Sequence, residues 1–486
     1  QQWKLTRILK IYSLSNMKIS TLSITTQTRT SKVQWLCSLY FLVLSFSSFS
    51  QQKEVSMIFV GDVMQHDGQI EAAYNSTSET YDYEDGFKFV KPILNEYDLR
   101  IANLEVTLAG KPYKGYPQFS APDDLAKTLV TSGFNVILTS NNHSCDRGEK
   151  GVSRTLDMLD ELGVKHTGTF RSKAERDANY PLMVEKNGIK IAMLNYTYGT
   201  NGLTVKAPLI VNYIDSNSIA EDVAKAKALK ADYIVCNMHW GMEYKPLPNN
   251  YQKKWESYCY ELGVDMVIGN HPHVVQPAEK KKIGNEEKLT VWSLGNFVSN
   301  MSIRYTRGGM MVGANIKKEN GSTTLGDVNH QFVYVLKRQE GKTKQYYILP
   351  DFNYNDYRKD FITSTELGKM NEFFSDSRGL YTEHAIGTKE KIIKPDSKTA
   401  ELYQKLLQEY YAVNMQTPNF DLLLDKNIGQ YLHQTTAQNG KRYLLSGVCE
   451  TYDQAKGIRQ FILDLNITDD ISIVRVTPKE ITKIEE

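Results

Sequence analysis

The sequence predicts an α/β fold for residues 55–300, in which short buried strands alternate with amphipathic helices. The first observation is a series of apolar runs of strand length, most of them followed by Gly, Asn, Asp, Glu or His. In chain order the runs are Val55 to Val60, Leu99 to Ala102, Val136 to Thr139, Ile189 to Tyr196, Tyr233 to Met238, Met266 to Ile268 and Leu289 to Leu294. The second observation is that helix-period patterns lie between them.

Two of these helical patterns are clear enough to assign a buried face. Apolar side chains recur near the 3.6-residue period in each of them. One stripe is Val152, Leu156, Leu159 and Leu162, and the other is Tyr251, Trp255, Tyr258, Cys259 and Leu262. We interpret both stripes as core faces rather than as contacts to a cofactor.

The first fifty residues differ from the rest of the chain. They carry six basic residues and no acidic one, and they continue into the apolar run Val33 to Phe46 and then Ser47 to Ser50. This order is typical of a secretory signal cleaved before Gln51. We expect translation to start at Met17, with the upstream residues being read-through. The alternative is a retained membrane anchor. We therefore expect an exported protein, periplasmic or anchored to the outer side of the cytoplasmic membrane.

Composition excludes some classes of function. Hydrophobic residues make up 41% of the chain and charged residues 23%, as in ordinary soluble domains. Without residues 1–50 the chain has 52 basic against 56 acidic residues, a net charge of −4. Nucleic acid is therefore not an expected partner. The four cysteines after residue 50 have no CxxC spacing, so a disulfide scaffold is not indicated.

The polar residues that follow the predicted strands are candidate ligands. In open α/β sheets, ligands bind beyond the carboxyl ends of the strands. Five of the nine histidines lie in or just after such clusters, namely His66, His143, His239, His271 and His273. Together with the carboxylates of Asp62 and Glu105 they offer mixed oxygen and nitrogen donors, which suit Zn, Mn or Fe.

Six ordered motifs carry a family resemblance. They are Gly61-Asp62-Val63-Met64, Asn103-Leu104-Glu105, Asn141-Asn142-His143, His239-Trp240-Gly241-Met242-Glu243, Gly269-Asn270-His271-Pro272-His273 and Ser293-Leu294-Gly295-Asn296-Phe297. In this order they resemble the CapA family of poly-γ-glutamate capsule synthesis proteins, over residues 55–300. That family is similar to calcineurin-like metallophosphoesterases. The resemblance implies a core of two packed mixed β-sheets flanked by helices, with two divalent metal ions at the strand ends.

The resemblance also implies roles for particular residues. The positions that match metal ligands are Asp62, Glu105, Asn142, His239, His271 and His273. His143 matches the residue that protonates a leaving group or holds a substrate oxygen, so His143 and Asp62 are the catalytic candidates. Glu105 between two cations could bridge them, and the pair would clamp a phosphoryl group.

Further candidates lie around this set, and two positions depart from the family pattern. The candidates for orienting a metal ligand or contacting the substrate are His66, Glu243, Asn141 and Asn296. For Glu243 the alternative is a surface salt bridge with Lys245. Metallophosphoesterases open with Asp-x-His, where this chain has Met64, a poor ligand for a hard cation. His66 could substitute for it. Glu105 stands where they use Asp.

After residue 300 the sequence is less informative. Gly308 to Ile316, Phe332 to Leu336 and Tyr346 to Leu349 are predicted strands that we expect to finish the second sheet of the core. Residues 351–425 are expected to form a helical extension and linker, with a helical stripe over 400–411. The core domain is accordingly placed at residues 51–350.

The last segment, residues 426–486, has the pattern of a small α/β module. A strand over Arg442 to Val448, a helix from Thr451 to about Leu465 and a strand over Ile471 to Val476 are predicted. The unit resembles a SPOR-type module, which implies peptidoglycan binding. The alternative is an α/β tail that packs on the main domain or on another chain.

Two classes of function remain open at this point. One is a metal-dependent hydrolase of the cell envelope, acting on a phosphoester or on a bond in a cell-wall or capsule polymer such as poly-γ-glutamate. The other is a non-catalytic component that binds or exports a capsule polymer together with membrane synthase partners. The ligand set favours the first class, and the missing Asp-x-His motif favours the second.

Overall fold

The computed structural model describes residues 53–76, 78–340, 343–354, 361–394, 397–408, 410–415, 432–436, 442–449, 452–464, 471–476 and 481–485. The chain divides into two compact units, residues 1–51 and 52–486, and every described residue belongs to the second. The predicted signal segment lies outside the described residues. Within the described part of the chain, no helix combines the length and the apolar character that crossing a membrane requires.

The first sheet is built around the first predicted strand. It has nine strands, with β1 at the centre. Three strands on one side run parallel to β1, and three strands on the other side alternate in direction, beginning with one antiparallel to β1. Along the sheet the order is β18 (Thr343–Pro350), β17 (Ser322–Glu340), β16 (Gly308–Glu319), β1 (Lys53–Val63), β4 (Leu99–Leu104), β5 (Val136–Leu138) and β6 (Lys165–Thr167). Two short strands join it, β15 (Asn296–Val298) beside β1 and β19 (Lys389–Glu390) beside β17.

The second sheet has six strands, of which the inner four are parallel. The order is β13 (Ala278–Ile283), β14 (Glu286–Val291), β12 (Met266–Asn270), β11 (Tyr233–His239), β9 (Ile189–Thr197) and β8 (Leu182–Lys186). The antiparallel edge strands β8 and β13 are not among the predicted strands. β13 contains three consecutive lysines, so it does not form an apolar run and was not predicted as a strand. Charged side chains are nevertheless typical of an edge strand.

One prediction about these sheets is wrong. The strands after residue 300 were expected to finish the second sheet, whereas β16 pairs antiparallel with β1 and so extends the first sheet. β1 lies in the middle of the first sheet, and its edge opposite β4 is where the antiparallel strand β16 pairs. Apolar periodicity specifies that a segment is a strand, but it does not specify which edge the strand joins.

The two sheets pack against each other through a shared apolar cluster. Phe59 and Ile101 of the first sheet and Ile191 and Ile268 of the second all belong to it, and each is at most 1% exposed. The predicted architecture of two packed mixed sheets is therefore confirmed.

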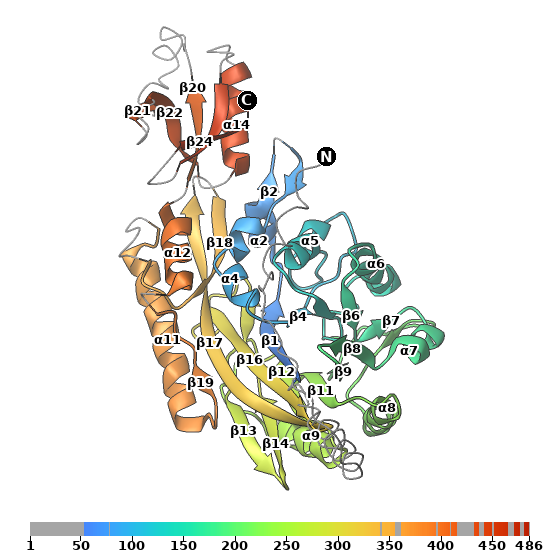
Figure 1. Ribbon diagram of the computed structural model, residues 1–486. Helices are drawn as coiled ribbons and strands as arrows, with labels where there is room; N and C mark the ends of the chain where they lie inside the picture. Colours follow the sequence, from blue (N-terminus) through green and yellow to red (C-terminus); the bar gives the residue numbers. More distant parts are fainter. Residues whose placement is uncertain are drawn as a thin grey trace, which may run out of the picture. The chain divides into compact units, whose positions relative to one another are not determined.

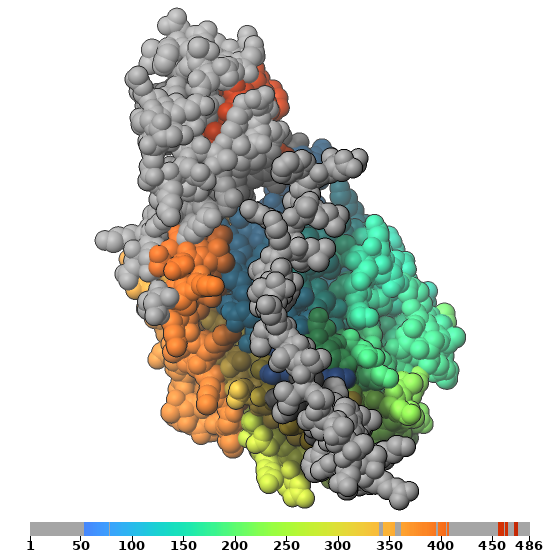
Figure 2. Space-filling view, in the orientation of Figure 1, coloured from blue at the N-terminus to red at the C-terminus, as the bar shows by residue number. Residues whose placement is uncertain are grey.

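Helices flank the core on both sides (Figure 1). The residues of α11 and α12 (orange) and those of α6 to α8 (green) lie on opposite sides of the core in Figure 2. The longer helices are α5 (Asp123–Thr131), α6 (Gly148–Glu161), α8 (Ser216–Ala228), α9 (Asn250–Glu261), α11 (Ser364–His384) and α12 (Lys398–Gln408), and α7 (Lys173–Asn179) is a short one. Short helices are α2 (Asp67–Ala73), α3 (Glu84–Phe87) and α4 (Lys91–Leu94), and two small ribbons pair β2 (Tyr74–Asn75) with β3 (Thr80–Tyr81) and β7 (Thr169–Phe170) with β10 (Ile210–Val211).

Both predicted helical stripes face the core. In α6, Val152 and Leu156 are buried, and in α9 Trp255 and Cys259 pack in the cluster that covers the outer face of the second sheet. The interpretation of these stripes as packing surfaces is confirmed except at Tyr251, which lies at the start of α9 and is exposed.

The C-terminal segment forms a small five-stranded sheet with one helix. The strands are β20 (Tyr410–Met415), β21 (Leu432–Thr436), β22 (Arg442–Cys449), β23 (Ile471–Val476) and β24 (Ile481–Glu485), and the helix is α14 (Tyr452–Asp464). The predicted strand, helix and strand are all present. However, β20 precedes residue 426, where we expected the module to begin, because its residues continue the apolar pattern of α12 without a break. The other segment boundaries stay predictions.

Candidate metal centre

The carboxyl ends of strands from both sheets meet at one place. In the first sheet, Asp62 near the end of β1 is level with Asn103 of β4 and with Asn296 of β15. In the second sheet, His239 at the end of β11 is level with Asn270 at the end of β12. The Asn270 amide nitrogen donates to the Asp62 carboxylate over 2.9 Å, which joins the two edges. The predicted site edge is therefore formed by both sheets.

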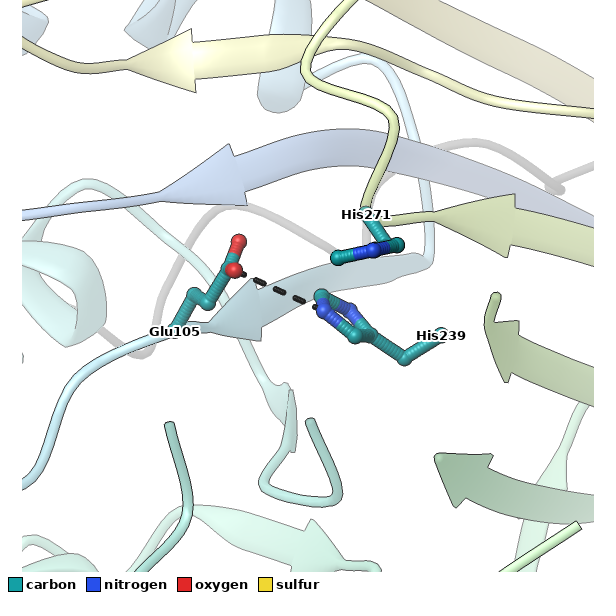
Figure 3. Close-up of side chains that lie close together, drawn as sticks. All are labelled: Glu105, His239 and His271. Carbon is teal, nitrogen blue, oxygen red and sulfur yellow. Dashed lines mark ion pairs between the residues drawn. The ribbon is translucent and has the colours of Figure 1, made fainter. Parts of the chain in front are cut away.

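Two groups of potential ligands share one carboxylate. Donor atoms of Asp62, Glu105 and His273 lie within 4.8 Å of one another, and so do those of Glu105, His239 and His271. Figure 3 shows the second group, with Glu105 directed toward His239. All five side chains are at most 3% exposed. Because Glu105 belongs to both groups, it is placed where a carboxylate can bridge two cations.

Asn142 adds a neutral oxygen to the second group. Its side-chain Oδ1 lies 2.7 Å from Nε2 of His239, and the same nitrogen is 3.4 Å from Oε1 of Glu105. The structure thus brings together all six residues that the sequence suggested as metal ligands.

Several donor atoms in this cluster have no hydrogen-bond partner among the described residues. These atoms are both carboxylate oxygens of Glu105 and Nδ1 of His271, and all of them are buried. Burying an unpaired carboxylate is costly unless a cation or a donor compensates it. Mixed carboxylate, amide and imidazole donors suit divalent Zn, Mn or Fe, so the residues present fit such an ion.

Hydrogen bonds fix the Asp62 carboxylate. Its Oδ1 accepts from the side-chain amides of Asn103, over 2.8 Å, and Asn270. Its Oδ2 accepts from the backbone of His271 over 3.3 Å and faces Nδ1 of His273 at 3.2 Å. Asn103 and Asn270 were not predicted as site residues, although both stand inside the motifs that carried the resemblance.

The protein environment sets the protonation of these groups. Burial raises the pKa of Glu105 well above its usual range, and the neighbouring Asp62 carboxylate raises it further. Burial acts in the same direction on Asp62, but the hydrogen bond and the charge of His273 outweigh it and hold the pKa of Asp62 below its usual range. Burial lowers the pKa of His271 to about 3 and that of His239 well below its usual range. Both imidazoles are therefore neutral near pH 7, the form that binds metals.

The His271-Pro272-His273 segment has an unusual backbone. His271 has φ of 102° and His273 has φ of 57°, values that residues with a side chain adopt rarely. Such strained conformations concentrate at functional sites, where the surrounding structure holds them in place. Here they direct two imidazoles from one short loop into the same cluster.

His143 lies beside this cluster and is held by a carboxylate that sequence reasoning missed. Nδ1 of His143 is 2.8 Å from Oδ2 of Asp146, which also accepts from the backbone of Phe119 over 2.7 Å. The Phe119 ring packs edge-on against the imidazole at 4.6 Å between centroids. Asp146 therefore orients His143. Its spacing of three residues from His143 in the sequence was the available signal.

The remaining predicted residues take different positions. Asn141 donates to the backbone of Leu104 over 2.8 Å and accepts from the backbone of His143 over 3.0 Å, so it shapes the ligand loop. Oδ1 of Asn296 lies 3.1 Å from Nδ1 of His273, the contact expected of an outer partner of a ligating histidine.

The suggestion that His66 replaces the histidine of an Asp-x-His motif is not supported. Nδ1 of His66 is engaged by Gln69 at 3.1 Å and by the backbone of Asn300 at 3.3 Å. Among the described residues, His66 belongs to neither ligand group, because it caps α2 instead. Met64 is buried in an apolar cluster.

The mouth of the cluster carries two residues with exposed surface. Tyr198, which follows β9 and was not predicted, places its ring 4.6 Å from that of His271 and is 40% exposed. The exposed Glu243 has a carboxylate oxygen within 4.8 Å of donor atoms of both His271 and His273. Glu243 and Lys245 both lie in the described part of the chain and form no ion pair with each other, so the alternative is not supported.

Comparison with known sequences gives one family and two similar proteins of assigned role. The family described as "Bacterial capsule synthesis protein PGA_cap" matches residues 56–301. The "Capsule biosynthesis protein CapA" of Bacillus anthracis is 27% identical over 307 residues, covering 60% of this chain and 70% of that protein. The "PGA biosynthesis protein CapA" of Bacillus subtilis is 28% identical over 278 residues, covering 55% and 69%.

Two solved structures are also similar. The calcineurin-like phosphoesterase YfkN from Bacillus subtilis aligns with a TM-score of 0.37 at 12% identity, covering 67% of this chain and 98% of that one. The NAD nucleotidase NadN from Haemophilus influenzae aligns with a TM-score of 0.37 at 13% identity, covering 68% of this chain and 61% of that one.

Proposed function

Because this chain belongs to the PGA_cap family of bacterial capsule synthesis proteins, we propose that it is a metal-dependent hydrolase of the bacterial cell envelope. Its substrate would be a phosphoester or a bond in a capsule or cell-wall polymer. Poly-γ-glutamate is the polymer implied by the family that the sequence motifs resemble, and the names of the two relatives refer to capsule and PGA biosynthesis. The family membership and the core architecture predicted from the sequence are confirmed. Metal dependence, hydrolysis and export are the proposal.

The observation that carries the proposal is the position of Glu105. It is fully buried, both of its oxygens lack a hydrogen-bond partner in the described structure, and it belongs to two ligand groups at once. A buried carboxylate without hydrogen bonds lowers the stability of the fold, so packing alone does not explain its presence. Two divalent cations there would supply Lewis acidity for hydrolysis of a phosphoryl or acyl bond.

The chain's own residues supply the rest of the chemistry. Asn142 would contribute an oxygen donor without adding negative charge, which preserves the Lewis acidity of the cations. His143, held by Asp146, has its Nε2 left to hold a substrate oxygen or to protonate a leaving group. Tyr198 stands at the mouth, where a substrate must pass.

A metal analysis tests this proposal. The whole chain would be exposed to Mn and Zn, desalted and analysed for metal, beside a His271→Ala/His273→Ala variant. We expect about two equivalents in the parent and a clear loss in the variant, because both ligand groups lose a nitrogen. A His166→Ala/His384→Ala variant is the matched control, since both of these histidines lie outside the ligand groups. A parent without metal, or equal metal in all three proteins, would refute the assignment.

A second prediction concerns the carboxylate behind His143. Asp146→Asn keeps the size of the side chain but removes the charge that orients the imidazole. We expect hydrolysis of phosphoester or γ-glutamyl test substrates to fall by about 100-fold, the low end of what general acid catalysis contributes. Metal content should stay unchanged, because Asp146 belongs to neither ligand group. Unchanged turnover would show that His143 needs no orienting partner.

One observation favours the non-catalytic alternative. Met64 is buried in an apolar cluster, so the Asp62 group has only three protein donors from the predicted set. A weakly held cation would suit a protein that binds a capsule polymer without turning it over. His143→Ala separates the two functions, since a binder would tolerate it and an enzyme would lose activity. Peptidoglycan contact through the C-terminal sheet and synthase partners in the membrane remain predictions.

A further inference from the structure

The exposed carboxylate of Glu243 stands at the opening of the candidate metal centre. It follows β11 by four residues, and one of its oxygens lies within 4.8 Å of a donor nitrogen of His271 and of His273. This makes a third ligand group that overlaps the first two. It is the only one of the three, among the described residues, that contains an exposed member.

The loop that carries Glu243 is fixed to the histidine loop. The backbone nitrogen of Tyr244 donates to the carbonyl of Pro272 over 2.8 Å, between the two histidines. The side-chain amide of Gln276 donates to the carbonyl of Lys245 over 2.9 Å.

The turn into this loop requires a glycine. Gly241 has φ of 98°, and a Cβ there would approach the side chain of Gln252 to 2.9 Å. The loop is therefore specified on both sides of Glu243, and the closeness of its carboxylate to the histidines is a built feature rather than a chance position of a surface side chain.

Counting donors shows what this carboxylate can add. The group of Glu105, His239 and His271 reaches four donors with Asn142, whereas the group of Asp62, Glu105 and His273 has three. Each imidazole nitrogen has one lone pair and binds one cation. A separate third cation would have to take nitrogens from the other two groups, so the added carboxylate is better used to complete a group that is one donor short.

We propose that Glu243 is a metal ligand, the fourth protein donor to the cation held by Asp62, Glu105 and His273. This inference rests on the proposed function, because it requires a cation at that place. Four protein donors are what a closed tetrahedral site contains. A donor on the solvent side differs from the buried ones, since an anionic group of a substrate can displace it without opening the core.

Calorimetric titration of the metal-depleted whole chain with Mn²⁺ tests the proposal, with elemental analysis for stoichiometry. In Glu243→Gln we expect one of the two binding events to weaken by at least about 10-fold while the other is unchanged. Glu243→Asp should restore part of the loss, because it keeps the charge. Glu261→Gln, which removes an exposed carboxylate at the end of α9, is the matched control and should titrate like the parent.

The outcomes separate this inference from the proposed function. Two events in the parent with one weakened in Glu243→Gln support it. If Glu243→Gln titrates like the parent, Glu243 is not a ligand and the proposed function still stands. A parent that takes up no Mn²⁺ overturns both. Because Glu243 is exposed, its replacement should leave the thermal unfolding of the metal-free protein unchanged, and this measurement excludes misfolding as the cause.

Discussion

Replacing Glu105 by Gln should remove the ligand that both groups share. The amount of bound metal should therefore fall more than for any other single substitution at the site. The amide keeps one oxygen donor but loses the charge that two cations would share. We expect at least one of about two equivalents to be lost and hydrolysis to fall by at least about 100-fold. Elemental analysis after desalting, together with turnover of a phosphoester, checks both expectations.

Glu105→Asp is the conservative control for this change. It keeps the charge on a shorter arm, so part of the metal should remain. Cation binding needs the ionised carboxylate, whereas burial raises the pKa of Glu105 in the metal-free protein. Metal uptake should therefore release a proton and tighten as the pH rises. A Gln variant that keeps two equivalents would show that Glu105 does not bridge.

Gly61→Ala should strongly destabilise the core, although it adds a single methyl group. A Cβ at Gly61 would lie 2.0 Å from the backbone oxygen of Gly295, which is part of the connection into β15. Both partners are backbone, and the adjacent Asp62 donates its N–H to the same oxygen over 2.8 Å, so neither can move without displacing the site. We expect a loss of at least about 3 kcal/mol of unfolding free energy, a large share of the total for a natural domain.

Gly379→Ala is the matched control. Gly379 is exposed in α11, and a Cβ there meets nothing within 4 Å. The same substitution should stabilise this helix by about 0.5–1 kcal/mol, because alanine loses less backbone entropy than glycine. Thermal unfolding followed by circular dichroism should therefore shift in opposite directions for the two variants. Shifts of the same sign would contradict the steric argument.

The sequence was sufficient for features that depend on one segment at a time. The apolar runs identified seven strands before residue 300, and the polar residues after them indicated a common edge, since parallel strands place their ends together. The six individual donors came from the family resemblance. The assignment of β16 to the wrong sheet has a different origin. Which edge a strand joins depends on the free edge of β1, and no residue in Gly308–Glu319 encodes that.

The same limit explains what was missed at the site. Asp146 acts through a contact with His143, and its spacing of three residues from His143 was the one sign of that contact in the sequence. Met64 was recognised as a departure, but only the structure shows that no nearby histidine replaces it. The exposed position of Glu243 likewise depends on how the loop after β11 folds back onto Pro272.

The two sheets contribute different donors to the centre. Asp62, Glu105 and Asn142 lie at the ends of β1, β4 and β5 in the first sheet, whereas the three histidines, His239, His271 and His273, lie at the ends of β11 and β12 in the second. Bound cations would therefore link the sheets as a cross-link does, at the edge where side-chain packing gives way to polar loops. Chelation should then speed amide hydrogen exchange at the ends of β1 and β12 before it affects their middles. In this arrangement the metals would maintain the alignment of the two halves of the core as well as serving the reaction.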